Sequence, residues 1–314
     1  MTPHTLVVVN PASAGGRTGR HWAEVATLML DAGLDFETYR TTAPGDATRA
    51  VRAALREGRT RVVAVGGDGT LNEVVDGFFA EDGTRLAPDA VLGLVPSGTG
   101  GDFRKAAGVP ADSREAVRLL ASGQTRRIDA GRIDFDSGAR RHFINIADCG
   151  LGGEVVARVN RSRFKGGGAR GTAVFLWQSL AALWTFGAHP VTVRVDTERF
   201  DGAVQSVVVA NGRYFGGGMH IAPDAALDDG LFDVVIVEAR GRVRSLRGLP
   251  SLYRGRHLGE PGVSVLRGAT VRIETPGAPL LFDVEGEQIG ATPATLTCLA
   301  GAIRVCAPAA SDAV

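Results

Sequence analysis

The sequence predicts an α/β domain followed by an all-β domain. Strands and helices alternate over roughly the first 125 residues, and strand-like runs then follow one another through the rest of the sequence. The 314 residues are also long for one hydrophobic core. The pattern changes near residues 123–127, so we expect a first domain at 1–126 and a second at 127–314, with the last residues packing back on the first.

The first domain is predicted to alternate buried strands with amphipathic helices. Strands are expected where short apolar or β-branched runs occur, at 5–10, 35–42, 61–66 and 90–96. Helices are expected where apolar residues recur at helical spacing, at 20–33, 45–58 and 71–79. Short connections between alternating elements are typical of a parallel sheet that is covered on both faces.

The second domain is predicted to be a β-sandwich with a helical insertion at 152–186. The strand-like runs lie at 127–135, 141–147, 191–196, 203–211, 231–238, 269–275, 279–286, 294–300 and 302–307. Turns rich in Gly, Asp and Pro separate them, which favours a sandwich or a barrel-like fold.

Composition excludes several classes of function. The formal charge is +1, which gives no electrostatic reason to expect a nucleic-acid partner. The three cysteines, Cys149, Cys298 and Cys306, form no disulfide framework and no C-x-x-C spacing, so we expect a reducing cytoplasm. The longest apolar run, 173–186, is too short to span a bilayer, so we do not expect an integral membrane protein.

Lysine is rare in this sequence. Only Lys105 and Lys165 are lysines among 35 basic residues, and neither lies in a G-x-x-x-x-G-K-[ST] loop or a V-A-I-K strand. P-loop nucleoside triphosphatases (NTPases) and protein kinases need such a lysine to bind the phosphates. Both classes are therefore excluded.

Three glycine-rich segments follow predicted strands, at 10–16 (NPASAGG), 66–70 (GGDGT) and 96–103 (PSGTGGDF). The carboxyl ends of parallel strands meet at one edge of a sheet, so these turns can form a phosphate cradle of backbone N–H groups. Asp68 would repel phosphate unless a cation intervened. We therefore expect Asp68 to hold a phosphate-bound Mg²⁺, directly or through water.

Alternatives remain open around the Gly-Gly-Asp-Gly segment. A single segment of this kind is also compatible with a simple tight turn, and it is the three together that favour nucleotide binding. Thr70, Asn72 and Glu73 are candidate ligand contacts. Thr70 is equally suited to cap the following helix, with Glu73 completing a capping box.

With these segments, the sequence resembles the diacylglycerol kinase catalytic-domain family, which includes bacterial lipid kinases, sphingosine kinases and ceramide kinases. The resemblance covers nearly the whole chain. Besides NPASAGG and PSGTGGDF, it rests on GGDGTLNEVVDG at 66–77, PDAALDDGLFDVVIV at 223–237 and DVEGEQIG at 283–290.

The resemblance implies an α/β nucleotide-binding domain, a β-sandwich and an active site in the cleft between them. It implies transfer of the γ-phosphate of ATP, with Mg²⁺, to a hydroxyl of a lipid such as diacylglycerol. The residues that it places around ATP are Asn10, Pro11, Gly15, Thr41 or Thr42, Gly66, Gly67, Asp68, Gly69, Thr70, Leu71, Asn72, Glu73, Gly98 and Thr99.

The resemblance also implies residues of the second domain. Glu285 stands where the family has its general base, and Asp283 is the alternative; "EGE" is equally compatible with a solvated hairpin tip. A structural Mg²⁺ would use Asp229 and the main-chain carbonyls of Ala226 and Leu231.

Two positions depart from the family pattern. Gly101 replaces the usual Asn, which puts one polar contact to the nucleotide in doubt, and Glu285 replaces the commoner Asp. Two other readings compete with a lipid kinase: a soluble kinase similar to NAD kinases, and a catalytically silent regulator that binds nucleotide or lipid.

A basic segment precedes an aromatic one at 161–184. This pattern suits transient contact with an anionic bilayer surface, and it equally suits a core helix beside a solvated loop. The sequence leaves the lipid acceptor and the oligomeric state open.

Overall fold

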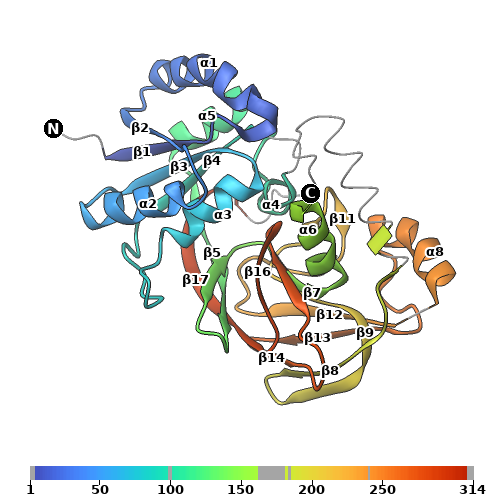
Figure 1. Ribbon diagram of the computed structural model, residues 1–314. Helices are drawn as coiled ribbons and strands as arrows, with labels where there is room; N and C mark the ends of the chain where they lie inside the picture. Colours follow the sequence, from blue (N-terminus) through green and yellow to red (C-terminus); the bar gives the residue numbers. More distant parts are fainter. Residues whose placement is uncertain (1–3, 98–100, 162–180, 183–184, 240, 310–314) are drawn as a thin grey trace. The chain divides into compact units, whose positions relative to one another are not determined.

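A parallel sheet begins the fold (Figure 1). Its strands are β1 (Thr5–Val9), β2 (Phe36–Arg40), β3 (Arg61–Gly66) and β4 (Val91–Pro96). They lie in the order β4-β3-β1-β2, and every neighbouring pair is parallel. Their carboxyl ends therefore meet at one edge of the sheet, where ligands bind in open α/β folds.

Helices cover both faces of this sheet (Figure 1). On one face, α1 (Arg17–Asp31) and α5 (Ser113–Ser122) pack on each other and on β1 and β4. On the other face, α2 (Asp46–Arg56) packs on α3 (Asp68–Asp76). The short helices η1 (Ser13–Gly16) and α4 (Asp102–Ala107) follow β1 and β4.

The computed structural model describes residues 4–97, 101–161, 181–182, 185–239 and 241–309, and it divides into two units. The first unit consists of Met1–Ala130 and Ala300–Val314, and the second is Gly131–Leu299. The boundary between the two units falls within β5 (Thr125–Phe135) and again within β17 (Ala294–Cys306). In the first unit, Arg304 and Val305 of β17 pair with Val91 and Leu92 of β4.

The second unit is mostly antiparallel sheet. Its strands are β6 (Arg140–Phe143), β7 (Ile146–Gly150), β8 (His189–Val195), β9 (Glu198–Ala210), β10 (Tyr214–Phe215), β11 (Met219–His220), β12 (Phe232–Glu238), β13 (Val263–Gly268), β14 (Thr270–Glu274), β15 (Leu281–Val284) and β16 (Glu287–Ala291). The helices α6 (Leu151–Arg161) and α8 (Arg242–Tyr253) accompany these strands in the described part of the unit. The main strand order is β16-β15-β7-β9-β8-β14-β17, and β12 pairs with β9 and β13.

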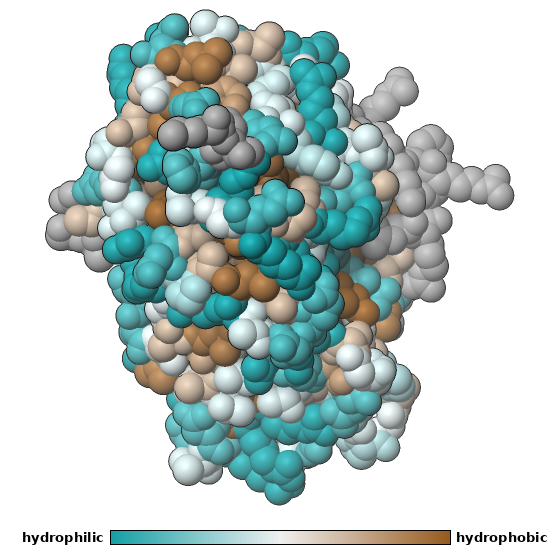
Figure 2. Space-filling view, turned by 90° about the vertical axis from the view of Figure 1, so that its left-hand side faces the viewer, coloured by the Kyte–Doolittle hydropathy of each residue, from teal (hydrophilic) through white to brown (hydrophobic). Residues whose placement is uncertain are grey.

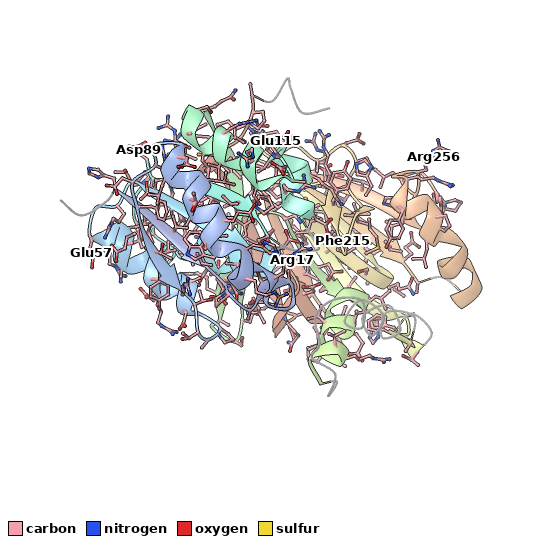
Figure 3. The ribbon with its side chains drawn as sticks, turned by 90° about the horizontal axis from the view of Figure 1, so that it is seen from above. Arg17, Glu57, Asp89, Glu115, Phe215 and Arg256 are labelled. Carbon is pink, nitrogen blue, oxygen red and sulfur yellow. The ribbon has the colours of Figure 1, made fainter. Side chains whose placement is uncertain are left out.

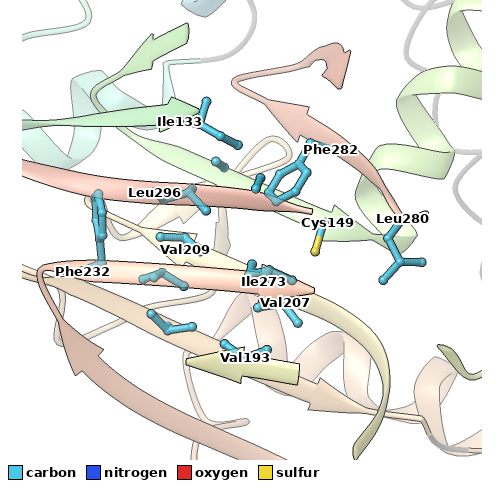
Figure 4. Packing of buried hydrophobic residues seen from close by; sticks show 14 of the residues in the cluster. Ile133, Cys149, Val193, Val207, Val209, Phe232, Ile273, Leu280, Phe282 and Leu296 are labelled. Atoms are coloured by element: carbon cyan, nitrogen blue, oxygen red, sulfur yellow. The ribbon is translucent and has the colours of Figure 1, made fainter. Parts of the chain in front are cut away.

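Alternating side chains of these strands form the core of the second unit. Figure 4 shows part of it, with Cys149, Val207, Phe232, Phe282 and Leu296 turned into one apolar cluster. All of them except Leu296 of β17 belong to strands β7, β9, β12 and β15. Apolar residues at every second position build the layer.

The architecture agrees with the sequence prediction: an α/β unit precedes a β-sandwich-like unit. Several elements begin or end differently from the prediction. Helix α3 begins at Asp68, inside the glycine segment, and not at residue 71. The sequence analysis missed α5, α8 and β13. In α5 the signal was available, because Ala116, Val117 and Leu120 recur at helical spacing and are buried.

The described surface is mixed in character. On the face shown in Figure 2, hydrophilic residues surround smaller hydrophobic groups. The large hydrophobic residues that are exposed among those described are Leu30, Tyr39, Tyr253 and Val265. Within the described residues, every helix is too short or too polar to cross a bilayer. The expected membrane-contacting segment, 161–184, lies almost wholly outside the described residues.

Candidate active site

A pocket of about 540 Å³ lies in the first unit, beside the carboxyl ends of β3 and β4. This volume is in the range of small-molecule sites. Its wall includes the first residues of α1, α3 and α5, among them Arg17, Asp68 and Ser113. Helix N-termini carry partial positive charge that favours an anionic ligand. At α5 the Asp112 carboxylate already accepts the Arg114 and Glu115 N–H groups, and the Arg17 N–H of α1 bonds main-chain carbonyls of η1, whereas α3 has no side-chain cap.

The turn after β3 is shaped by its glycines. A Cβ on Gly66 would lie 2.6 Å from Thr70 Oγ1, so no larger residue fits there. A Cβ on Gly67 or Gly69 would meet no atom within 4 Å. Packing inside the protein thus requires glycine at position 66. At Gly67 and Gly69 the space beside the backbone is open, which suits a turn whose backbone a ligand approaches.

Asn10 joins the first glycine-rich segment to this turn. Its Nδ2 donates to Thr70 Oγ1 at 3.1 Å, and its Oδ1 accepts the Ala12 N–H at 3.1 Å. The cap of α3 is Gly67, and no side chain caps the helix. The capping-box alternative for Thr70 and Glu73 is therefore wrong, because Thr70 bonds Asn10 and Glu73 accepts the Ala47 N–H at 3.2 Å.

Asp68 lines the pocket as a half-buried carboxylate. Its Oδ2 accepts the Gly101 N–H at 2.8 Å. Burial raises the pKa of Asp68, the Gly101 N–H opposes that effect, and the negative charge of Asp102 adds to it. Gly101 meets Asp68 through its backbone, with φ of 107°, which a glycine adopts readily.

The surroundings of Asp68 fit a metal ion that arrives with a nucleotide. A partly desolvated carboxylate near a second acid gains from a cation, and Mg²⁺ in phosphate sites commonly uses one or two carboxylates together with phosphate oxygens. Asp68 is the described residue that would hold such an ion; Asp102 is buried, does not line the pocket and pairs with Lys105 at 3.4 Å.

The pocket is also lined by arginines that the sequence analysis did not identify. Arg17 of α1, Arg104 of α4 and Arg114 of α5 belong to the wall, and Arg17 is labelled in Figure 3. Guanidinium groups match phosphate oxygens well. The position of Arg17, directly after the NPASAGG segment, was the available signal.

The predicted ATP contacts divide into those that line the pocket and those that do not. Gly66, Gly67, Asp68 and Leu71 line it. Asn10, Pro11, Gly15, Gly69, Thr70, Asn72 and Glu73 do not, and Asn72 is fully buried without a hydrogen-bond partner among the described residues. Gly98 and Thr99 lie outside the described residues.

Thr41 and Thr42 follow β2 and lie beside α2. The Thr42 N–H and hydroxyl both donate to Asp46 Oδ2 at 2.7 Å. These bonds lower the pKa of Asp46. Their visible effect is to order the loop before α2, and neither threonine lines the pocket.

Glu285 lies in the two-residue turn between β15 and β16 of the second unit. Its Oε1 accepts the N–H groups of Ile144 and Asn145 at 2.7 and 2.6 Å. Its φ of 55° lies in the left-handed region, which non-glycine residues seldom adopt unless their surroundings hold them. The carboxylate is therefore anchored, unlike that of a solvated hairpin tip.

Asp229 is bound differently from the implied Mg²⁺ site. Its Oδ1 accepts the Leu231 N–H at 3.0 Å, and its Oδ2 accepts a hydrogen bond from Arg267. Arg267 Nε also lies 3.3 Å from Asp233, whose pKa is raised by burial. Since a guanidinium already neutralises this carboxylate, the described donors fit Mg²⁺ poorly; the metal role of Ala226, Asp229 and Leu231 stays a prediction.

Comparison with known proteins gives two family matches. Residues 4–133 match the family described as "Diacylglycerol kinase catalytic domain", and residues 145–307 match "YegS C-terminal NAD kinase beta sandwich-like domain". Together they cover both units.

Relatives match over nearly their whole length. A "Diacylglycerol kinase" of Bacillus subtilis (strain 168) is 30% identical over 96% of this chain and 95% of its own length. A "Probable lipid kinase YegS-like" of Stenotrophomonas maltophilia (strain K279a) is 30% identical over 98% and 97%. A crystal structure of a diacylglycerol kinase from Bacillus anthracis str. Sterne, 21% identical, shares the fold with a TM-score of 0.70 over 98% of this chain and 97% of that one.

Proposed function

Because the chain belongs to the diacylglycerol kinase catalytic-domain family of lipid kinases, we propose that it transfers the γ-phosphate of ATP to a hydroxyl of a diacylglycerol-like lipid. The observation that carries the nucleotide half of this proposal is the pocket of the first unit. It combines the N-terminus of α3, which no side chain caps, with Arg17 and the carboxylate of Asp68 at the carboxyl edge of a parallel sheet.

The pocket suits a polyphosphate that is accompanied by a cation. Phosphoryl transfer depends mainly on positioning and on neutralising charge at the transferred group. The open backbone at Gly67 and the guanidinium of Arg17 would bind phosphate oxygens. Asp68 would hold Mg²⁺, which supplies the remaining positive charge when bound.

Glu285 is assigned the role of general base. A hydroxyl needs an acceptor for its proton during transfer, and a carboxylate held in a defined direction provides one. The Ile144 and Asn145 N–H groups fix the direction of the Glu285 side chain. The replacement of Asp by Glu leaves this chemistry intact.

The lipid acceptor is proposed from the names of the relatives and not from a described pocket. Relatives over nearly the full length are named diacylglycerol kinase or lipid kinase. The acceptor that these names have in common is a lipid with a hydroxyl group. Transient contact of residues 161–184 with a bilayer belongs to the same proposal.

The test is a phosphorylation assay with ATP and Mg²⁺ on lipids in mixed micelles. The panel contains diacylglycerol, phosphatidylglycerol, a sphingoid base and ceramide, with NAD as a soluble control. Labelled lipid product that requires ATP and Mg²⁺ supports the proposal and identifies the acceptor. Label on NAD alone would indicate a soluble kinase, and tight ATP binding without transfer would indicate a regulator.

A further inference from the structure

Two aspartates face each other on neighbouring strands of the second unit. In the antiparallel pair β7–β15, Asp148 lies directly opposite Asp283. Side chains opposite each other in such a pair have Cβ atoms about 5 Å apart and point to the same face. Their chain neighbours Cys149 and Phe282 point into the core, as Figure 4 shows, so both carboxyls lie on the other face.

Helix α6 packs on β7 and β15 and leaves little space around Asp148. Asp148 is 2% exposed, and a Cβ on Gly152 of α6 would lie 2.1 Å from its Oδ2. Ser206 Oγ donates to Oδ2 at 3.5 Å. Oδ1 is buried and has no hydrogen-bond partner among the residues that the structure describes.

No described ion pair joins either carboxyl to a cation. On the elements packed against them, the described titratable groups are Glu154 and Arg158 of α6, which pair at 2.6 Å, and Glu287 of β16, which pairs with Arg141 at 2.9 Å. The Cys149 thiol lies on the core side, and burial raises its pKa. Two facing carboxyls without a cation do not both ionise readily.

Their titration behaviour agrees with this geometry. Burial and the charge of Asp283 raise the pKa of Asp148 well above its usual value, with Ser206 opposing. Burial raises the pKa of Asp283 to about 7, the Gly286 N–H opposes it, and Glu287 adds to it.

Asp283 also supports the turn that carries Glu285. Its Oδ1 accepts the Gly286 N–H at 2.7 Å. Glu285 and Gly286 both have positive φ, at 55° and 89°, as in type I′ turns. Because left-handed backbone at Glu285 must be held by its surroundings, the carboxyl of Asp283 helps to fix the Glu285 side chain.

We propose that Asp148 and Asp283 share one proton and thereby position Glu285, with Asp283 acting as a positioning residue. Protonated Asp148 donates from its otherwise unpartnered Oδ1 to Asp283, which in turn accepts the Gly286 N–H. When the pair loses this proton, repulsion separates the carboxyls and the turn loses its support. The role of Glu285 in this inference rests on the proposed function, whereas the shared proton does not.

The first test measures the proton without using activity. Selective ¹³C labelling of aspartate carboxyls, followed by NMR across pH, is expected to show an aspartate that titrates near pH 7. In Asp148→Asn the pKa of Asp283 should move downwards, because an amide donates permanently to Asp283, while its own burial still holds that pKa above the usual range. The exposed Asp201→Asn serves as control and leaves the signal in place.

The pH dependence of stability provides a second test, and the direction of the change is fixed by the raised pKa. The folded pKa is raised, so this pair favours folding at low pH and the advantage is lost as pH rises through the folded pKa. The unfolding temperature of the wild type should fall with pH in that window, and that of Asp148→Asn should fall less. If Asp148→Asn does not fold, Asp283→Asn replaces it, since its amide oxygen still accepts the Gly286 N–H.

The third reading concerns turnover. The kcat of the wild type should decline where the pair loses its last proton, at a pH above the titration near 7, with an unchanged KM for ATP. Asp148→Asn should lose this decline, whereas a merely structural defect would lower kcat equally at every pH. Absence of a high-pH aspartate signal overturns the inference whatever the activity. Full turnover by Glu285→Gln, with that signal present, overturns the proposed base and leaves the shared proton standing.

Discussion

Asn10 and Thr70, sixty residues apart in the sequence, are joined by a hydrogen bond of 3.1 Å from Asn10 Nδ2 to Thr70 Oγ1. Asn10 follows β1, and Thr70 lies in the first turn of α3, after β3. The bond therefore ties together two of the glycine-rich segments at the carboxyl edge of the sheet. A Cβ at position 66 would clash with the same Thr70 hydroxyl, so this position requires glycine.

Thr70→Val should lower the free energy of unfolding by about 1 kcal/mol and weaken ATP binding. Valine keeps the shape of the side chain but leaves Asn10 Nδ2 without its acceptor. Thermal unfolding and calorimetric titration with ATP measure the two effects. Thr70→Ser retains the hydroxyl and should behave like the wild type; equal behaviour of the Val and Ser variants would show that the bond contributes nothing.

Asp68→Asn should abolish Mg²⁺-dependent turnover while raising the unfolding temperature of the nucleotide-free protein near pH 8 by a few degrees. The pKa of Asp68 is raised in the folded state, so stability from this group is present at low pH and lost as pH rises through the folded pKa. Ionised Asp68 thus costs stability near neutral pH, and Asn removes that cost while still accepting the Gly101 N–H. A lower unfolding temperature near pH 8 would contradict this assignment.

Arg17→Gln should weaken ATP binding about tenfold and AMP binding much less, because a charge-assisted bond to the outer phosphates is worth about 1.4 kcal/mol. Titration calorimetry with each nucleotide measures the difference. Arg118→Gln provides a matched control, since Arg118 is an exposed residue of α5 that does not line the pocket. A loss of the same size for ATP and AMP would place Arg17 away from the outer phosphates.

Glu285→Gln should retain ATP binding within about twofold while lowering turnover by at least about a hundredfold. The amide still accepts the Ile144 and Asn145 N–H groups but no longer takes a proton. Steady-state kinetics on the lipid product, with ATP titration alongside, give both numbers. Loss of nucleotide binding in this variant would mean that the roles of the two units are assigned wrongly.

Arg267→Gln should destabilise the protein by about 1–2 kcal/mol, and added Mg²⁺ should recover part of that loss. Removing the guanidinium leaves Asp229 and the buried Asp233 without their cation. Chemical denaturation with Mg²⁺ or with a chelator measures both. Arg199→Gln, which breaks an exposed pair with Asp201, should change little. If a chelator strongly destabilised the wild-type protein, that result would instead indicate a structural metal.

The sequence predicted the fold well because the fold depends on patterns that a sequence contains. Residues 62–65 are apolar throughout, and the structure has β3 at Arg61–Gly66. The order of the glycine segments predicted one edge of the sheet, where Gly66, Gly67 and Asp68 line the pocket. The start of α3 was missed because Gly and Asp are weak helix formers whose use here depends on tertiary contacts.

The details of the site could not be read in the same way. Nothing in the local sequence shows that Arg104 and Arg114 reach the pocket of Asp68, since α4 and α5 are brought there by the packing of whole elements. The pairing of Asp148 with Asp283 depends on the register of two strands that are far apart in the chain. Arg267 meets Asp229 for the same reason, because β13 pairs with β12.

The route of β17 bears on the order in which the protein can be completed. Arg304 and Val305 close the β4 side of the parallel sheet, yet they are synthesised after the whole of the second unit. Until they emerge from the ribosome, the β4 margin has unpaired N–H and C=O groups, the kind of margin to which foreign strands adhere. The part of the protein that is translated first is therefore the part that is finished last.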